Sequence, residues 1–348
     1  MPAKQVSVFV AGSWGTALAS VLADNGADVL VWTRSENQAQ EINERSTNER
    51  YVPGVRLSER IRATTNMEQA VRHGEALLFV APSSAMREVV RSALSFIRKG
   101  QLFIHATKGF EAETLKRMTE VLSDELGSEH ADSICVLSGP SHAEEVIRRC
   151  PTTVVIASSK QASAEAAQDL FISPYFRVYT NPDVVGVEVG GALKNIIALG
   201  AGMSDGLGFG DNAKAALLTR GLAEIGRLGV AMGANQLTFA GLAGVGDLVV
   251  TCTSRHSRNW RAGALLAEGK PLAEVLSTLG MVVEGVRTTK AAIALAKRCG
   301  IEMPIAAQLY SVLFEGKDPR TAVEDLMGRV RTHEIEEIAR STAPKWSR

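Results

Sequence analysis

The chain has 348 residues, of which 45% are hydrophobic and 22% are charged, a balance typical of a globular protein long enough for two domains. Its 38 Lys and Arg residues equal its 38 Asp and Glu residues, so the net charge is zero. This neutrality argues against nucleic acid as the main partner, because nucleic-acid-binding domains usually carry a basic excess.

The cysteines and the N-terminal segment indicate the compartment in which the protein works. The four cysteines lie too far apart for a CxxC pair or a metal cluster, so we expect reduced thiols and no metal. The apolar run VSVFVA near the N-terminus is shorter than the roughly 7–15 residues of a secretory signal. No stretch approaches the roughly 20 apolar residues of a membrane span. We therefore expect a cytoplasmic protein.

Apolar, β-branched segments alternate with amphipathic helices in the first half of the chain. Strands are expected over 5–11, 28–34, 76–81, 102–107, 134–139 and 152–158, with helices between them such as 83–97 and 112–126. Alternation of this kind predicts an α/β domain with a doubly wound parallel sheet of the Rossmann type. We assign this domain to residues 1–182.

From about residue 183 the helical patterns follow one another with almost no strand signal. They cover 183–204, 212–232, 258–268, 286–299, 304–315 and 319–329. The sequence therefore predicts an all-α domain over residues 183–340. Asn181 and Pro182 break the preceding element, and Asp183 is a suitable cap for the first of these helices.

The segment VSVFVAGSWGTALASVLADNG, residues 6–26, predicts a strand, a tight turn and a helix that would bind a dinucleotide pyrophosphate. Gly12 would let the backbone approach the phosphates, and Gly15 would let helix and strand pack closely. Val10 occupies the first glycine position of the Gly-x-Gly-x-x-Gly pattern. The turn tolerates this residue if it keeps ordinary strand dihedrals. An ordinary strand–turn–helix without a ligand is the alternative.

The second strand would end at Thr33 and Arg34, where NAD-selective sites have an acidic residue for the ribose 2′-hydroxyl. A guanidinium can instead bind a 2′-phosphate bidentately. NADP is therefore favoured or at least accepted beside NAD. The alternative is that Arg34 only stacks or is solvated.

Two lysines stand in positions that suggest chemistry. Lys108, in HATKGF, follows a predicted strand at the sheet edge where ligands bind, and SGPSHAEEV ends the next strand in the same way. Lys194, in EVGGALKNIIALGAG, lies on a helix face that is otherwise apolar or small. Burial there would lower its pKa, as a general acid or base requires, although a snorkelling lysine would give the same pattern. Gly190 and Gly191 weaken this helix and suggest close approach to a cofactor or substrate.

The segment GVGDLVVTCTSRHSRNWRAG, residues 244–263, forms a third cluster. Asp247 stands in an apolar, Gly-rich setting and needs a cationic or hydrogen-bonding partner. Ser257, Arg258 and Asn259 lie at a predicted helix start. A hydroxyl, a guanidinium and free N–H groups together suit a phosphate.

With the motifs GSWGTALA, ATKGF, SGPSHAEEV, EVGGALKNIIALGAG, AGVGDLVVTCTSRHSRN and VVEGVRT, residues 5–335 resemble the NAD(P)-dependent sn-glycerol-3-phosphate dehydrogenases, particularly the bacterial biosynthetic type. The resemblance implies a cytoplasmic homodimer that uses NADP or NAD. Its reaction would interconvert dihydroxyacetone phosphate and sn-glycerol 3-phosphate for phospholipid synthesis. Val10 departs from the glycine that this family has at that position.

The resemblance also implies roles for individual residues. Lys194 would be the catalytic proton donor and acceptor at the C2 oxygen. The substrate-binding residues it implies are Lys108, Gly139, Ser141, Lys194, Asn195, Asp247, Thr251, Ser257, Arg258 and Asn259. With Gly12 and Gly15 of the turn, the cofactor-binding residues are Ser13, Trp14, Arg34, Lys108, Ala143, Arg258, Val282 and Glu284.

Two other functions fit the same elements. A related dehydrogenase for a β-hydroxy acid would share the two-domain plan but would bind a carboxylate instead of a phosphate. A non-catalytic NAD(P)H sensor would keep the glycine turn but would not need Lys194 on an apolar helix face.

Overall fold

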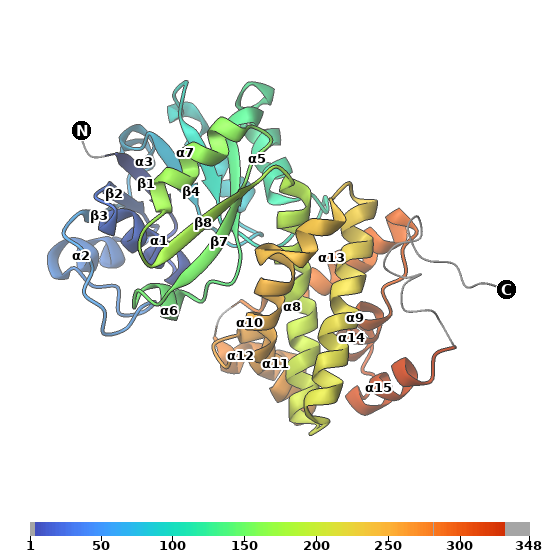
Figure 1. The fold of residues 1–348 in the computed structure, drawn as a ribbon. Coiled ribbons are helices and arrows are strands. Elements are labelled where there is room, and N and C mark those ends of the chain that lie inside the picture. Colours follow the sequence, from blue (N-terminus) through green and yellow to red (C-terminus); the bar gives the residue numbers. More distant parts are fainter. Residues whose placement is uncertain (1–3, 281, 331–348) are drawn as a thin grey trace. The chain divides into compact units, whose positions relative to one another are not determined.

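The structure is a computed structural model that describes residues 4–280 and 282–330 (Figure 1). The chain divides into two compact units, Met1–Glu188 and Val189–Arg348. The division falls inside helix α8 (Val184–Gly206), whereas the sequence places the domain boundary just before this helix.

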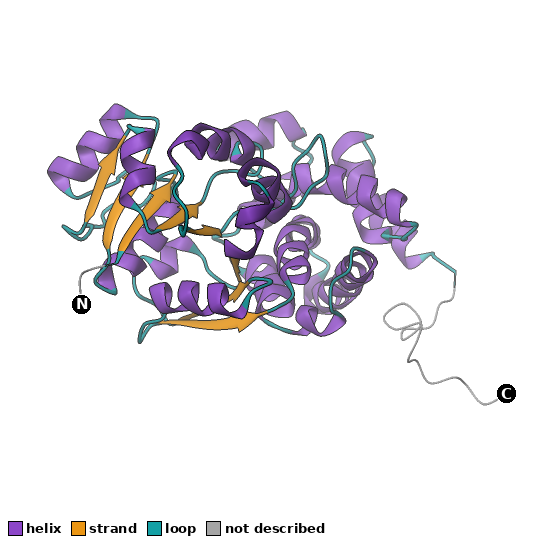
Figure 2. Ribbon diagram, turned by 90° about the horizontal axis from the view of Figure 1, so that it is seen from above, coloured by secondary structure: helices purple, strands orange, loops and turns teal. Residues whose placement is uncertain are grey.

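The first unit is built on an eight-stranded sheet with the order β3-β2-β1-β4-β5-β6-β7-β8. The strands are β1 (Gln5–Phe9), β2 (Asp28–Trp32), β3 (Ile61–Thr64), β4 (Ala76–Phe79), β5 (Leu102–His105), β6 (Ile134–Ser138), β7 (Thr152–Ala157) and β8 (Phe176–Asn181). The helices are α1 (Ser13–Asp24), α2 (Glu36–Arg45), α3 (Met67–His73), α4 (Met86–Ala93), α5 (Met118–Leu126), α6 (Ala143–Val146) and α7 (Gln161–Phe171). Figure 2 colours the helices purple and the strands orange. The doubly wound α/β fold is confirmed, with β3 and β8 added to the predicted strands.

Alternate side chains of the central strands enter two separate hydrophobic cores. In β1, Val6 and Val8 belong to the core that contains the apolar face of α1, whereas Phe9 belongs to the core that contains residues of α3, α4 and α5. Leu78 and Phe79 of β4 divide in the same way. Because both faces are buried, the strands read as continuous apolar runs, which is how the sequence revealed them.

One strand pair departs from the expected parallel sheet. β7 runs antiparallel to β6, while all other neighbouring strands in the sheet are parallel. The connection from β6 to β7 contains only α6, a helix of four residues. A parallel return needs a crossover that spans the length of the strand, usually with a longer helix, so this connection instead turns back beside β6.

The second unit is helical throughout its described residues, as predicted. After α8 it contains α9 (Gly210–Ala231), α10 (Asp247–Thr253), α11 (Arg258–Ala267), α12 (Leu272–Leu279), α13 (Glu284–Cys299), α14 (Pro304–Phe314) and α15 (Pro319–Met327). α10 and α12 are the helices that the sequence patterns missed. α10 follows a short π-helical turn over Leu242–Gly246, whose glycines weaken any helical pattern.

Helix α8 is long and apolar enough to cross a membrane by length and composition, although the sequence analysis expects no such stretch. Within the protein, 83% of its most apolar window is buried, which is the behaviour of a core helix in a globular protein. Its mean hydropathy therefore reflects its place at the centre of the helical unit.

Candidate active site

The turn after β1 holds a strained residue at Val10. Its φ is +84°, in the left-handed region that β-branched residues rarely adopt, so the expectation of ordinary strand dihedrals is wrong. The Val10 N–H donates to the Trp32 carbonyl oxygen at 3.0 Å. The Val10 carbonyl oxygen lies against Gly15, where a Cβ would come within 2.2 Å of it. These contacts hold a conformation that costs about 1–3 kcal/mol.

The same turn leaves room for a ligand. Gly12 is the N-cap of α1, and a Cβ on it would meet no described atom within 4 Å. The first N–H groups of a helix have no partners inside the helix and carry positive partial charge. The open space and these donors fit the pyrophosphate of a dinucleotide. Beside them, Ser13 donates its hydroxyl to the Tyr51 carbonyl oxygen at 2.8 Å, and Trp14 packs partly into the core.

Two side-chain amides, of Asn48 and Gln38, hold the turn after β1 through hydrogen bonds. The Asn48 side chain is fully buried and donates to the Ala11 carbonyl oxygen at 3.0 Å and to the Thr16 hydroxyl at 2.8 Å. Gln38 of α2 donates to the same carbonyl at 2.8 Å and to the Asn48 side-chain oxygen at 3.0 Å. Sequence reasoning missed both amides, because Asn48 stands in a polar stretch that is indistinguishable from a solvated loop.

Arg34 lies at the end of β2 with 57% of its side chain exposed. Its guanidinium pairs with Glu88 at 3.4 Å, and that carboxylate is itself mostly exposed. A pair between two exposed side chains contributes at most about 1 kcal/mol, so an anionic ligand could displace Glu88.

Lys108, Gly139 and Ser141 meet at the carboxyl ends of β5 and β6. The Lys108 Nζ donates to the Gly139 carbonyl oxygen at 3.3 Å, and the Ser141 hydroxyl donates to the same oxygen at 2.9 Å. Ala143 begins α6 directly afterwards. The structure thus brings together three predicted site residues from two separate sequence motifs.

Lys194 is buried in the helical unit, with 6% of its side chain exposed. Its ammonium donates to the Asp247 carboxylate and, at 2.7 Å, to the Thr251 hydroxyl. Both partners are buried side chains of α10. The snorkelling alternative is therefore wrong for this lysine, and Asp247 has the cationic partner that its apolar setting required.

Gly190, four residues ahead of Lys194, serves a packing purpose. A Cβ on Gly190 would lie 2.4 Å from the Ala243 carbonyl oxygen, in the turn that leads into α10. The close approach that the sequence suggested is therefore to the protein's own backbone at this position. It brings the start of α10, and with it Asp247, against α8.

The start of α11 gathers the predicted phosphate-binding residues. Ser257 is the N-cap and accepts the Trp260 N–H at 3.2 Å, while the exposed Arg258 donates to the Val282 carbonyl oxygen at 3.1 Å. Asn259 donates to the Asn195 side-chain oxygen at 2.8 Å. Asn195 follows Lys194, so these residues adjoin the buried ion pair.

A second contact extends this cluster to α13. The Asn259 side-chain oxygen accepts the Gly285 N–H at 2.9 Å, next to Glu284 at the first position of that helix. The structure thus brings Val282 and Glu284 close to the start of α11, with residue 281 outside the described chain.

Helices α8 and α11 cross with their backbones in contact. A Cβ on Gly202 would lie 1.9 Å from the Trp260 carbonyl oxygen, and one on Gly263 would lie 2.0 Å from the Leu199 carbonyl oxygen. Each glycine therefore admits the main chain of the opposite helix. Gly202 ends the motif EVGGALKNIIALGAG and Gly263 ends the segment 244–263, but no pattern in either segment predicts that the two helices touch.

A cavity, a buried thiol and the metal-ligating side chain types were also compared with this site. A cavity of about 570 Å³ lies between α8, α9, α14 and α15, but its lining is mainly apolar and contains none of the predicted site residues. Burial raises the pKa of Cys252 to about 12, so its thiol is a poor nucleophile. Across residues 4–280 and 282–330, no group of three His, Cys, Asp or Glu side chains is placed to hold a metal ion.

Comparison with known proteins gives the same relationship over both units. Residues 5–164 match the family described as NAD-dependent glycerol-3-phosphate dehydrogenase N-terminus, and residues 183–324 match the corresponding C-terminus. The chain is 58% identical over 335 residues to a glycerol-3-phosphate dehydrogenase [NAD(P)+] of Bacillus licheniformis, which covers 96% of this chain and 97% of that protein. The Bacillus subtilis protein of the same name is 57% identical over the same shares.

A solved structure agrees with these relatives. The glycerol-3-phosphate dehydrogenase of Coxiella burnetii superposes with a TM-score of 0.89 at 39% identity, covering 94% of this chain and 99% of that one.

Proposed function

Because the chain belongs to the NAD(P)-dependent glycerol-3-phosphate dehydrogenase family, we propose that it reduces dihydroxyacetone phosphate to sn-glycerol 3-phosphate and so supplies phospholipid synthesis. The chain is an oxidoreductase that uses NAD or NADP. The observation that carries the proposed site is the buried ion pair of Lys194 and Asp247, close to Ser257, Arg258 and Asn259 at the start of α11, for which we propose anion binding.

In this proposal residues 1–182 bind the dinucleotide and residues 183–340 bind the substrate. The pyrophosphate lies at the turn of Gly12 and Gly15, with Ser13 and Trp14 beside it. The further cofactor contacts are Arg34, Lys108, Ala143, Arg258, Val282 and Glu284. The open space at Gly12 and the N-terminus of α1 support this placement.

Arg34 carries the proposed acceptance of NADP, because its exposed guanidinium can bind the 2′-phosphate in place of Glu88. We expect Arg34→Asp to lower the NADPH/NADH ratio of kcat/KM about tenfold, since the introduced carboxylate repels a 2′-phosphate and accepts from a 2′-hydroxyl. The measurement is kcat/KM with both cofactors at one ionic strength, because salt screens an exposed pair. Glu88→Gln is the matched control, since it removes the charged partner of Arg34 and keeps Arg34 itself. The NADPH/NADH ratio of kcat/KM should be unchanged or higher in this variant. An unchanged NADPH/NADH ratio in Arg34→Asp would show that Arg34 does not bind the 2′-phosphate.

In this proposal the turn at Val10 lies against the pyrophosphate, which NAD and NADP share. We therefore expect Val10→Gly to change the dissociation constants of NADPH and NADH by the same factor, because the turn meets only the pyrophosphate. Titration of cofactor fluorescence measures both constants. A change in their ratio beyond about threefold, or roughly 0.7 kcal/mol, would contradict this placement of the turn.

The substrate half of the proposal places the phosphate of the substrate against Ser257, Arg258 and Asn259. The other substrate contacts are Lys108, Gly139, Ser141, Lys194, Asn195, Asp247 and Thr251. The exposed guanidinium of Arg258, held only lightly by a carbonyl oxygen, supports its use for an anion.

The residues of this chain supply the proton chemistry. When bound, the nicotinamide supplies the hydride that C2 of the substrate receives. Lys194 then gives a proton to the developing alkoxide at the C2 oxygen, and the cation of Lys108 stabilises that charge. Asp247 and Thr251 hold the Lys194 ammonium in one direction through their hydrogen bonds. Such directed proton transfer typically contributes about 10²–10⁴-fold in rate.

The decisive assay follows NADPH absorbance with dihydroxyacetone phosphate as substrate. Turnover supports the proposal, and turnover only with 3-oxo acids would support the β-hydroxy acid alternative. Cofactor binding without turnover of either would indicate a sensor.

The proposal also includes a cytoplasmic homodimer. The four cysteines are all free, which suits a reducing compartment. Sedimentation velocity measures the subunit number.

A further inference from the structure

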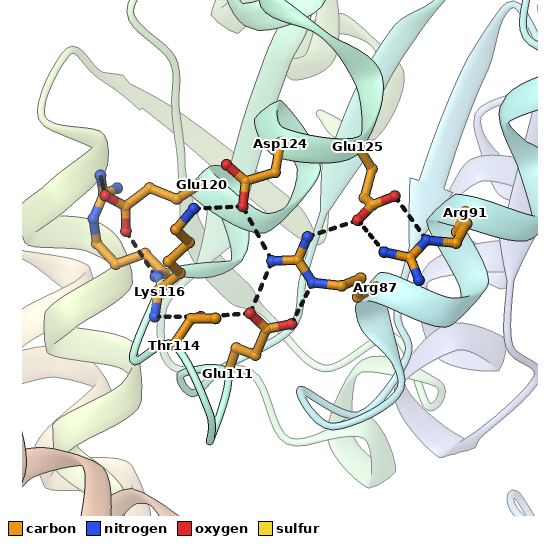
Figure 3. A network of polar contacts seen from close by, with 9 residues as sticks. Arg87, Arg91, Glu111, Thr114, Lys116, Glu120, Asp124 and Glu125 are labelled. Carbon is orange, nitrogen blue, oxygen red and sulfur yellow. Dashed lines mark hydrogen bonds and ion pairs between the residues drawn. The ribbon is translucent and has the colours of Figure 1, made fainter.

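A cluster of charged side chains connects α4 and α5 with Glu111, Thr114 and Lys116 (Figure 3). These three residues belong to the loop that follows Lys108 in the sequence. Arg87 of α4 is its centre, with three-quarters of its side chain buried. Its guanidinium donates twice to Glu111, at 2.6 and 2.8 Å, and also to Glu125 at 2.6 Å and Asp124 at 3.1 Å. The hydrogen bond from Arg87 holds the pKa of the Glu111 carboxyl below its ordinary value.

Glu111 organises the loop in turn. Its backbone N–H donates to the Lys116 carbonyl oxygen, and its own carbonyl oxygen accepts the Leu115 N–H, each at 2.9 Å. Its carboxylate also accepts the Thr114 hydroxyl at 2.5 Å. Arg87 therefore binds a residue that contacts both backbone and side-chain groups of the loop.

The residue before Lys108 is tied to the same region. The Thr107 hydroxyl donates to the Ala81 carbonyl oxygen at 2.6 Å, just past β4 and on the segment that leads into α4. Lys108 thus lies between two contacts that tie its loop to residues 81–87. One is the hydrogen bond from Thr107 to Ala81, and the other is the ion pair between Glu111 and Arg87. Its own ammonium donates to the Gly139 carbonyl oxygen at 3.3 Å, and the two contacts fix the main chain from which this side chain extends.

We propose that Arg87 is a positioning residue for catalysis, which holds Lys108 at the reacting centre through its bidentate pair with Glu111. This inference rests on the substrate-contacting role proposed above for Lys108. The bidentate geometry matters because it fixes the direction of the Glu111 side chain as well as its distance. Displacement of a catalytic group by about 1 Å can cost about a hundredfold in rate, so even a partial release of the loop has a measurable effect.

The test is a double-mutant cycle between positions 87 and 108. Arg87→Gln is expected to lower kcat/KM about tenfold in the parent protein and to have little further effect in a Lys108→Ala background. Arg91→Gln is the matched control, because Arg91 lies on the same helix and pairs with Glu125 at 2.8 Å without touching Glu111. Its kcat/KM should stay at the parent value.

The outcomes separate the two proposals. An unchanged kcat/KM in Lys108→Ala overturns the role of Lys108 itself. A large loss in Lys108→Ala, with Arg87→Gln costing the same factor in both backgrounds, overturns the positioning role alone. Should Arg87→Gln fail to fold, Glu111→Gln weakens the same pair from the loop side and runs the same cycle.

Discussion

Replacement of Lys194 by alanine is expected to lower kcat by about 10²–10⁴-fold, the usual contribution of a positioned general acid. This expectation rests on the Lys194 ammonium, which is buried and donates to the Asp247 carboxylate and the Thr251 hydroxyl. Removal of the lysine also leaves the Asp247 carboxylate buried without its cation, so stability should fall by about 3–5 kcal/mol. The measurements are single-turnover rates by NADPH absorbance and the free energy of unfolding.

Two variants separate the catalytic loss from the loss of stability. Lys194→Arg keeps a cation beside Asp247, but a guanidinium does not release its proton near neutral pH, so this variant should be better folded and still inactive. Lys214→Ala removes another paired lysine of the helical unit, from its contact with Asp205, and should keep the parent rate. Activity of Lys194→Ala within about threefold of the parent, under 1 kcal/mol of barrier, would exclude Lys194 as the proton donor.

Arg258→Ala is expected to raise KM for dihydroxyacetone phosphate about tenfold to a hundredfold, because a charge-assisted contact with phosphate is worth about 1.5–3 kcal/mol. The effect on folding should be small, since the guanidinium is exposed and its described contact is one carbonyl oxygen of Val282. The measurement is KM and kcat with saturating NADPH. The reverse reaction with glycerol 3-phosphate and with glycerol shows whether the loss depends on the phosphate.

Arg261, also exposed and one turn further along α11, gives the matched control. Arg261→Ala removes the same charge from the same helix and should leave KM near the parent value. If Arg258→Ala keeps the parent's preference for glycerol 3-phosphate over glycerol, the phosphate is bound elsewhere.

Much of the fold could be predicted because burial leaves a simple mark on the sequence. Central strands with both faces covered must be apolar throughout, and the helical half repeats a single period. β8 was not predicted because it lies at the edge of the sheet. Its side chains at Arg177, Tyr179 and Thr180 are exposed, so the strand lacks a continuous apolar run. The antiparallel direction of β7 was not predicted because strand direction depends on the length of a connection.

The candidate site divides along similar lines. Lys194 was predictable, since an isolated lysine on an apolar helix face requires a partner, and the structure supplies Asp247. The positive φ of Val10 was not, because the residue type argues for a strand and only the surrounding contacts impose the turn. Arg87 gives no sequence signal at all, because its carboxylate partners are 24 to 38 positions away and look like surface charges.

The backbone contact between α8 and α11 also bears on substrate length. α8 carries the proposed proton donor and α11 begins with the proposed phosphate-binding residues, and the two helices touch through Gly202 and Gly263 without intervening side chains. Main-chain atoms in contact cannot adjust as side chains do, so the distance between the proposed proton donor on α8 and the proposed phosphate-binding residues on α11 is fixed. A phosphorylated ketone one methylene longer would be displaced by about 1 Å at one end, at a cost of about a hundredfold in rate. In the proposed site, the contact between these helices would therefore limit the substrate to the length of a three-carbon phosphate.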